Sequence, residues 1–169
     1  MPTFEDIIYA VDGSAAVITI NRPEVYNAFR AHTVVELIGA FRLAWADTNV
    51  HSVILTGAGD EAFCSGGDQK QRAKTGDYGS SPSGMFEIGN LHKIIRDIPK
   101  PTIAPVNGIA VGGGHVLHVL CDVSIASETA RFGQEVALSV VRTDHPGTGH
   151  GADRTERNPQ WATSTERSR

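Results

Sequence analysis

Apolar and polar positions follow two different periods along the first 126 residues of this chain. Runs rich in β-branched residues predict strands at residues 14–20, 50–56, 102–106 and 123–126. Apolar side chains at helical spacing predict helices at residues 33–46 and 86–98, and a short buried helix that follows a triple glycine and ends near Cys121. This alternation of strands and helices is typical of an α/β fold with right-handed crossovers.

Each predicted helix is expected to bury one face. In the helix at 33–46, Thr33 is expected to cap the start, and the inward side chains are Val34, Leu37, Ile38, Phe41, Ala44 and Trp45. In the helix at 86–98 they are Ile88, Leu91, Ile94, Ile95 and Ile98, and in the short helix Val116, Leu117, Val119 and Leu120. The stretch at 70–84 is polar and rich in glycine and serine, which predicts a mobile loop.

The apolar pattern stops at Val141, because residues 142–169 contain no Val, Ile, Leu, Met or Phe. Trp161 is the one large apolar side chain in that segment. Such a segment buries too little apolar surface to offset its ordering entropy. The sequence therefore predicts a folded core at residues 1–134 and a divergent, disordered or loosely attached tail at residues 135–169.

Composition narrows the classes of partner. The formal net charge of −4 provides no basic footprint for nucleic acid, and no apolar run approaches the roughly 18 residues of a membrane span. The first residues lack the basic start and apolar middle of a signal peptide. Cys64 and Cys121 have neither CxxC spacing nor a disulfide framework. We therefore expect a reduced, cytoplasmic protein without a membrane or nucleic-acid partner.

Two glycine clusters carry the main chemical signal. Gly66 and Gly67 come after one predicted strand, and some forty residues later residues 112–114 form a triple glycine that comes after another. Glycine lets the backbone turn sharply and leaves N–H groups free for a ligand. Two such clusters on one scaffold can direct two amides at a single oxygen, which predicts an oxyanion hole and chemistry on a carbonyl.

Four motifs in order connect these clusters to a known family. They are Asn21-Arg22-Pro23 with Asn27-Ala28-Phe29, the segment at 63–69, Pro99-Lys100-Pro101, and the segment at 112–122. Together they resemble the crotonase (enoyl-CoA hydratase/isomerase) superfamily, over about residues 4–134. The resemblance implies a crotonase-like fold of repeated ββα units, here lacking the usual C-terminal helices. It also implies an acyl-CoA thioester as partner and a family habit of forming trimers or hexamers.

Within the superfamily, the segment at 63–70 with Arg72 and Tyr78, and the segment at 112–118, most resemble 1,4-dihydroxy-2-naphthoyl-CoA synthases. Those enzymes are carbon–carbon lyases of menaquinone biosynthesis, which close a ring in o-succinylbenzoyl-CoA. The 2-ketocyclohexanecarboxyl-CoA hydrolases, which open a ring, share part of these segments and the opening at residues 4–9. Enoyl-CoA hydratases and isomerases fit less well, because Val116 stands where hydratases carry their first catalytic Glu. A truncated, non-catalytic acyl-CoA-binding fragment is the alternative outside enzymes.

The resemblance also implies a set of site residues. The amides of Gly67 and Gly113 would hold the thioester oxygen as the catalytic donors. The CoA contacts would be Arg30, Ser65, Gly66, Asp68, Gln69, Lys70 and Arg72, the substrate contact Tyr78, and the lining of the thioester channel Ile109, Ala110, Val111 and Gly112. No tightly bound cofactor is expected, because CoA enters as part of the substrate. Bicarbonate, which some relatives use, has no retained site in this chain.

Other reactive side chains receive structural interpretations. His115 and His118 lie three residues apart on one helical face, but further metal ligands are missing, so core histidines are expected. Cys64 has no base nearby in the sequence and is not expected to be a nucleophile.

The chain departs from the resemblance after Gln134. Glu135 differs in type from the family's substrate-contact residue, and the positions that serve proton transfer in the naphthoyl-CoA synthases fall on Val136, Val141 and Thr143. The abrupt change resembles a frameshift or an aberrant end. We therefore expect an oxyanion hole without its proton-transfer groups, and weak or no turnover.

Overall fold

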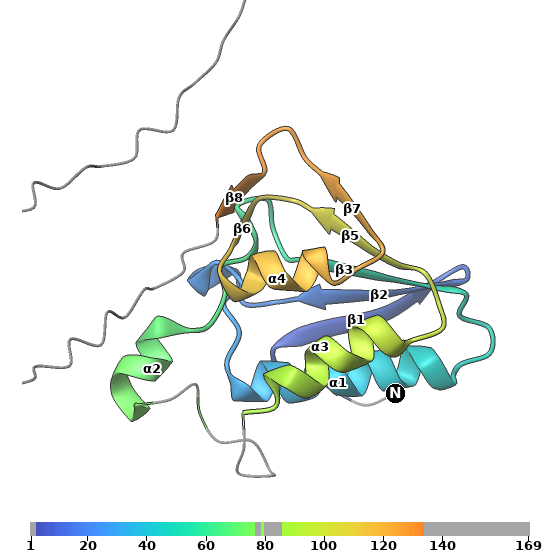
Figure 1. The fold of residues 1–169 in the computed structure, drawn as a ribbon, viewed down its shortest axis with the longest axis horizontal. Helices are drawn as coiled ribbons and strands as arrows, with labels where there is room; N and C mark the ends of the chain where they lie inside the picture. Colours follow the sequence, from blue (N-terminus) through green and yellow to red (C-terminus); the bar gives the residue numbers. More distant parts are fainter. Residues whose placement is uncertain (1–2, 77–78, 80–85, 134–169) are drawn as a thin grey trace, which may run out of the picture. The chain divides into compact units, whose positions relative to one another are not determined.

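The structure, a computed structural model, describes residues 3–76, 79 and 86–133 (Figure 1). The predicted tail at 135–169, Tyr78 and most of the second half of the predicted loop at 70–84 lie outside the described residues.

The larger sheet has five strands in the order β1-β2-β3-β5-β7. An antiparallel hairpin opens it, with β1 (Ile7–Asp12) paired to β2 (Ala15–Ile20) so that Ile7 faces Ile20. The other strands run parallel to β2: β3 (Ser52–Gly57), β5 (Thr102–Val106) and β7 (Val123–Ala126). The sequence predicted four of these strands and missed β1, whose residues after Ile7 are mostly exposed or half-buried.

A smaller parallel sheet is formed by three strands that come after β3, β5 and β7 in the chain. Its strands are β4 (Ala62–Cys64), β6 (Ile109–Val111) and β8 (Arg131–Gly133), in the order β4-β6-β8. Each of these strands follows a strand of the larger sheet, and helices α2 (Gln69–Thr75) and α4 (Gly113–Val119) follow β4 and β6. The predicted α/β fold of repeated ββα units is confirmed in the part of the chain that the structure describes.

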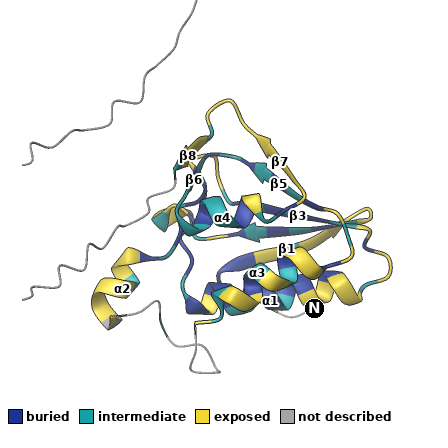
Figure 2. Cartoon of the chain, in the orientation of Figure 1, coloured by how far each residue is buried: buried dark blue, intermediate teal, exposed yellow. Residues whose placement is uncertain are grey.

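Two longer helices cover the core. α1 (Ala31–Ala46) and α3 (Ile88–Asp97) lie alongside each other and contact one another, and α1 also packs on β1 and β2 (Figure 1). The core contains Val34, Leu37, Phe41, Leu91 and Ile95 from these helices, all of them fully or almost fully buried (Figure 2). The predicted inward faces are therefore largely confirmed.

Four details differ from the sequence-based expectation, each for a local reason. α1 begins at Ala31 with Arg30 as its N-cap, so Thr33 occupies the third helical position and accepts a hydrogen bond from the Arg30 amide. Part of the predicted loop is α2, because the Asp68 side chain caps its first amides and Gly76, with φ +79°, ends it. Trp45 is 42% exposed and Val119 is 61% exposed, because they lie at the last turns of α1 and α4, beyond the packed stripe.

None of the helices in the described ranges has the length and apolar character needed to cross a bilayer.

Candidate functional site

The first glycine cluster is held by an isolated parallel bridge between Phe29 and Gly67. The Phe29 amide donates to the Gly66 carbonyl at 2.8 Å, and the Asp68 amide donates to the Phe29 carbonyl at 2.9 Å. In such a parallel bridge the N–H and C=O groups of the middle residue point away from the partner strand. The Gly67 amide therefore faces away from the Phe29 backbone, and within the described residues it has no hydrogen-bond partner.

The second cluster opens α4. Gly112, with φ +53°, sits between β6 and the helix, a backbone conformation that favours glycine. Its amide donates to the Gly133 carbonyl at 3.0 Å, which ties the turn to β8. Gly113 is the first residue of the helix, so its amide has no intrahelical acceptor. In the part of the chain that the structure describes, that amide has no other acceptor either.

The two clusters touch. A Cβ added at Gly66 would lie 3.1 Å from the Gly113 nitrogen, and one added at Gly113 would lie 2.6 Å from the Phe29 ring. A Cβ at Gly114 would lie 1.9 Å from the Cys64 carbonyl oxygen, too close for any residue but glycine. Glycine is thus required sterically, and the close packing brings the two unpaired amides of Gly67 and Gly113 onto adjoining segments.

A hollow of about 340 Å³ adjoins Gly67. It is lined by Glu24, Val25, Tyr26, Ala28, Ser65, Gly67, Asp68, Gln69 and Lys70. Five of the predicted site residues therefore lie together at one concave surface. Sequence reasoning missed Tyr26, which is half exposed at the rim and has a left-handed φ of 54°. The signal that could have found it is the short segment between Asn21-Arg22-Pro23 and Asn27, which was used only for the family resemblance.

The predicted thioester channel runs along β6 and the following turn. Ile109, Val111 and Gly112 are partly buried there, whereas Ala110 is fully buried in the core. Lys70 and Arg72 lie on α2 and are exposed. These positions are consistent with a ligand path from α2 past Gly67, but the individual contacts stay predictions.

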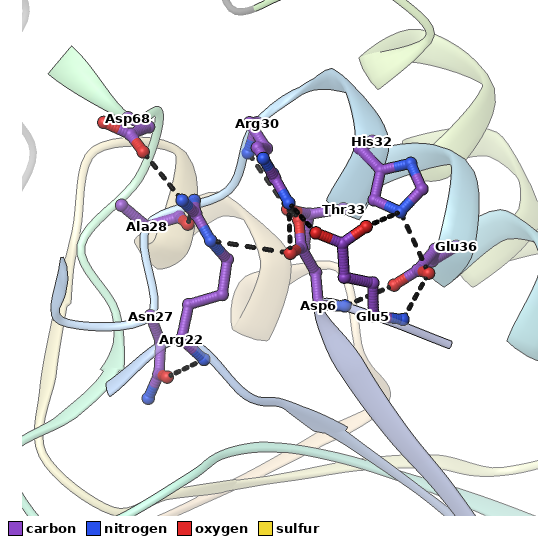
Figure 3. A network of polar contacts seen from close by, with 10 residues as sticks. All are labelled: Glu5, Asp6, Arg22, Asn27, Ala28, Arg30, His32, Thr33, Glu36 and Asp68. Carbon is purple, nitrogen blue, oxygen red and sulfur yellow. Dashed lines mark hydrogen bonds and ion pairs between the residues drawn. The ribbon is translucent and has the colours of Figure 1, made fainter. Parts of the chain in front are cut away.

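The predicted cation Arg30 belongs to a polar network (Figure 3). Its guanidinium donates to Asp6 at 2.8 Å and to Glu5 at 2.8 Å, and these bonds and charges raise the pKa of Arg30 despite its partial burial. Burial opposes ionisation of Asp6, yet the hydrogen bonds from Arg30 and Thr33 outweigh it and lower the pKa of Asp6. Arg30 thus helps join the segment before β1 to α1, and its contact with a CoA phosphate stays a prediction.

Asp68 also has a structural role in addition to its place at the hollow. One carboxylate oxygen accepts from the amides of Lys70 and Gln71, at 3.0 Å each, and the other accepts from Arg22 at 3.0 Å. Burial alone would raise the pKa of Asp68, but these bonds and the charge of Arg22 lower it overall. The carboxylate is therefore ionised at neutral pH and fixes the segment directly after Gly67.

His118 is a buried histidine with both ring nitrogens partnered. Its Nε2 lies 2.9 Å from Nδ1 of His115, and its Nδ1 lies 3.0 Å from the Ser124 hydroxyl. Within the described residues, no group of three metal-ligating side chains forms around this pair. His118 is thus the buried, partnered histidine that was expected, whereas His115 is only partly buried.

Cys64 is fully buried, two residues before Gly66 of the first glycine cluster. Burial raises the pKa of the Cys64 thiol to about 12, so it stays protonated at neutral pH. A protonated thiol is a weak nucleophile, and the expectation that Cys64 has no catalytic role stays a prediction.

Comparison with known proteins decides the family. The model of the enoyl-CoA hydratase/isomerase family matches residues 11–142, most of the chain. The chain belongs to this family. Among solved structures, an enoyl-CoA hydratase/isomerase from Xanthobacter autotrophicus is similar at 34% identity with a TM-score of 0.71, over 78% of this chain and 49% of that one. An enoyl-CoA hydratase from Bacillus anthracis is similar at 32% identity with a TM-score of 0.69, over 77% of this chain and 50% of that one.

A third structure, EchA1_1 from Mycobacterium paratuberculosis, is similar at 40% identity with a TM-score of 0.68, over 76% of this chain and 49% of that one. The chain thus spans about half the length of each of these family members. The matches confirm the predicted superfamily. The names of the first two are those of a hydratase/isomerase and a hydratase, and they give no support to a naphthoyl-CoA synthase in particular.

Proposed function

We propose that this chain binds an acyl-CoA thioester and holds the thioester carbonyl oxygen between the amides of Gly67 and Gly113. The observation that carries the proposal is the contact between two glycine clusters, each with an amide that has no partner in the described structure. Membership of the enoyl-CoA hydratase/isomerase family supports an acyl-CoA as the ligand. The hollow beside Gly67 and the exposed cations Lys70 and Arg72 on α2 support a path for the anionic CoA moiety.

The chemistry follows from the two donors. When a proton leaves the carbon next to the thioester, negative charge collects on the carbonyl oxygen, where the amides stabilise it. Each well-aimed donor of this kind contributes about 3–4 kcal/mol to lowering the barrier. Hydration, isomerisation and ring closure of acyl-CoA substrates all benefit from such stabilisation.

Ring closure in o-succinylbenzoyl-CoA is our second, finer candidate. Val116 of α4 favours it over hydration, because an apolar side chain there cannot transfer the proton that a hydratase needs. Turnover of o-succinylbenzoyl-CoA without turnover of crotonyl-CoA would support ring closure, and the reverse would support a hydratase. The cytoplasmic location, the oligomeric state and the low turnover expected from residues 135–169 are predictions of the sequence alone.

The first test compares two ligands that differ at one position. Acetyl-CoA carries a carbonyl group next to its sulfur, whereas S-ethyl-CoA has a CH₂ group in place of that carbonyl group and is otherwise matched. Two ground-state hydrogen bonds at about 0.5–1.5 kcal/mol each predict that acetyl-CoA binds about 5- to 150-fold more tightly. Isothermal titration of the full chain measures both affinities, with CoA alone as the control for the shared moiety. Equal affinities for the two ligands would contradict the proposed oxyanion hole.

A further inference from the structure

The Arg22 side chain forms hydrogen bonds to both segments of the Phe29–Gly67 bridge. Arg22 follows β2 and precedes the short helix η1 (Pro23–Val25). Its guanidinium makes two hydrogen bonds in different directions: Nη1 donates to the Ala28 carbonyl at 2.5 Å, and Nη2 donates to the Asp68 carboxylate at 3.0 Å (Figure 3). Nothing in the proposed chemistry uses this side chain.

The two acceptors lie on opposite sides of the bridge. Ala28 precedes Phe29 on one segment, and Asp68 follows Gly67 on the other. The bridge itself is isolated, and its two backbone hydrogen bonds belong to neither sheet of the described residues. The same two segments are also joined before the bridge, where the Ser65 amide donates to the Tyr26 carbonyl at 3.0 Å. Arg22 adds a side-chain connection between the two segments at the bridge itself, through one rigid planar group.

The connection is shielded from water. The Arg22 side chain is 12% exposed and that of Asp68 is 8% exposed. Asp6, with a side chain 5% exposed, lies 3.7 Å from Arg22 Nε and supplies a second negative charge beside the guanidinium. Charged hydrogen bonds in such surroundings are screened weakly and hold their geometry better than exposed pairs.

The Arg22 backbone is fixed as well. Its amide donates to Oδ1 of Asn27 at 3.0 Å, and Nδ2 of that fully buried Asn27 donates to the carbonyls of Ala58 and Ala62. The guanidinium therefore extends from a rigid base. A displacement of the bridge would move Gly67 directly, and it would move Gly113 through the Phe29 ring that packs against it.

We propose that Arg22 is a positioning residue for the oxyanion hole: it joins Ala28 to Asp68 and thereby fixes the direction of the Gly67 amide. The inference rests on the proposed binding of a thioester at Gly67 and Gly113. It assigns to Arg22 an effect on the polarisation of the carbonyl, beyond any effect on folding.

The test measures polarisation of the ligand rather than stability. Acetyl-CoA labelled with ¹³C at the thioester carbonyl is bound to the full chain at saturating protein, and its C=O stretching frequency is recorded by infrared difference spectroscopy. Hydrogen bonds from both amides lower this frequency relative to free acetyl-CoA. In Arg22→Gln we expect most of that shift to be lost, while the affinity for CoA alone stays within about threefold of the wild type, since ground-state hydrogen bonds contribute modestly.

Lys100→Gln is the matched control. Lys100 is also a half-buried cation that joins two backbone carbonyls, those of Ala44 and Asp47, but it lies at the far end of α1. Its loss should lower the unfolding temperature and leave the carbonyl frequency unchanged. A merely structural role for Arg22 would give the same result in both variants.

Arg22→Lys keeps the charge but cannot donate to two acceptors through a planar fork, so we expect it to restore little of the frequency shift. It also provides a folded variant should Arg22→Gln fail to fold. A wild-type frequency shift in folded Arg22→Gln or Arg22→Lys would overturn the positioning role and leave the proposed function intact. Absence of any shift in the wild-type chain would overturn the proposed function itself, and the role of Arg22 with it.

Discussion

At the scale of single residues, buried ionisable groups couple the stability of the fold to pH. His118 is 6% exposed, and burial together with the neighbouring His115 lowers its pKa below the ordinary value of 6.5. The unfolded chain therefore binds a proton at this residue more readily than the folded chain does. The stability that a neutral His118 provides is complete above pH 6.5 and is lost as the pH falls through 6.5 toward the lower folded pKa.

The lowered pKa of His118 predicts that the free energy of unfolding falls as the pH is lowered from 7.5 to 5.5. His118→Asn should show a weaker fall than the wild type, by at most about 1.4 kcal/mol per pH unit below 6.5. Urea unfolding at both pH values measures the difference. Burial also lowers the pKa of His92, so the wild-type slope has a second source that remains in this variant. His51→Asn, at an exposed position, is the control and should keep the wild-type slope; a His118→Asn slope equal to it would contradict the prediction.

The two glycine clusters are visible in the sequence, and the resemblance to the superfamily singled out Gly67 and Gly113 within them. The sequence did not predict that Asp68 caps α2 or that Arg22 donates to Asp68. Arginine and aspartate are usually exposed, and only the fold brings Arg22 within 3.0 Å of a residue 46 positions away. Their partners depend on tertiary distance, which spacing along the chain does not encode.

At the scale of elements, the start of α4 is fixed by its contact with the end of β4. Gly114 lies directly over the Cys64 carbonyl, where an added Cβ would be 1.9 Å from the oxygen and 2.6 Å from the carbonyl carbon. Because both atoms belong to the backbone, no side-chain rotation relieves the clash. The helix or the strand must move instead, and the second glycine cluster moves with it.

Gly114→Ala should therefore lower the free energy of unfolding by about 2 kcal/mol or more, the range of overpacked core positions. Gly89→Ala in α3 is the control, since Gly89 has no atom within 4 Å of an added Cβ. The greater helix propensity of alanine should leave the free energy of unfolding of Gly89→Ala equal to that of the wild type or raise it by up to about 1 kcal/mol. Denaturant titration of both variants gives the comparison, and equal stabilities would show that α4 is free to shift away from β4.

The longer elements were predictable because their apolar periods are strong. β5 and β7 begin and end where the sequence placed them, and α3 and α1 differ only at their ends. β1 was missed although five of its six residues are apolar, because residues 4–9 were used only for the family resemblance. β4, β6 and β8 are three residues each, too short for a period. α2 was missed because its sequence has no apolar stripe, and its helix depends on the Asp68 cap.

At the scale of the whole molecule, large apolar side chains are exposed on α4, β7 and β8. All four residues of β7 are exposed, with Val123 at 50% and Ile125 at 60%, and Val119 of α4 and Phe132 of β8 are at 61% and 47% (Figure 2). The two β7 side chains are two residues apart and so share one face of the strand. On β1, the other edge of the same sheet, Ile8 and Val11 are three residues apart and point to opposite faces.

An apolar pair on one face binds a hydrophobic dye better than two isolated side chains, because the dye covers both at once. The double variant Val123→Thr with Ile125→Thr should therefore reduce the fluorescence of bound anilinonaphthalene sulfonate more than Ile8→Thr with Val11→Thr does. Threonine keeps the strand propensity at all four positions, so both variants should unfold close to the wild-type temperature. Dye titration at equal protein concentration gives the comparison. Equal reductions in the two variants would mean that the dye binds elsewhere, and that the exposed residues of β7 do not act as one apolar surface.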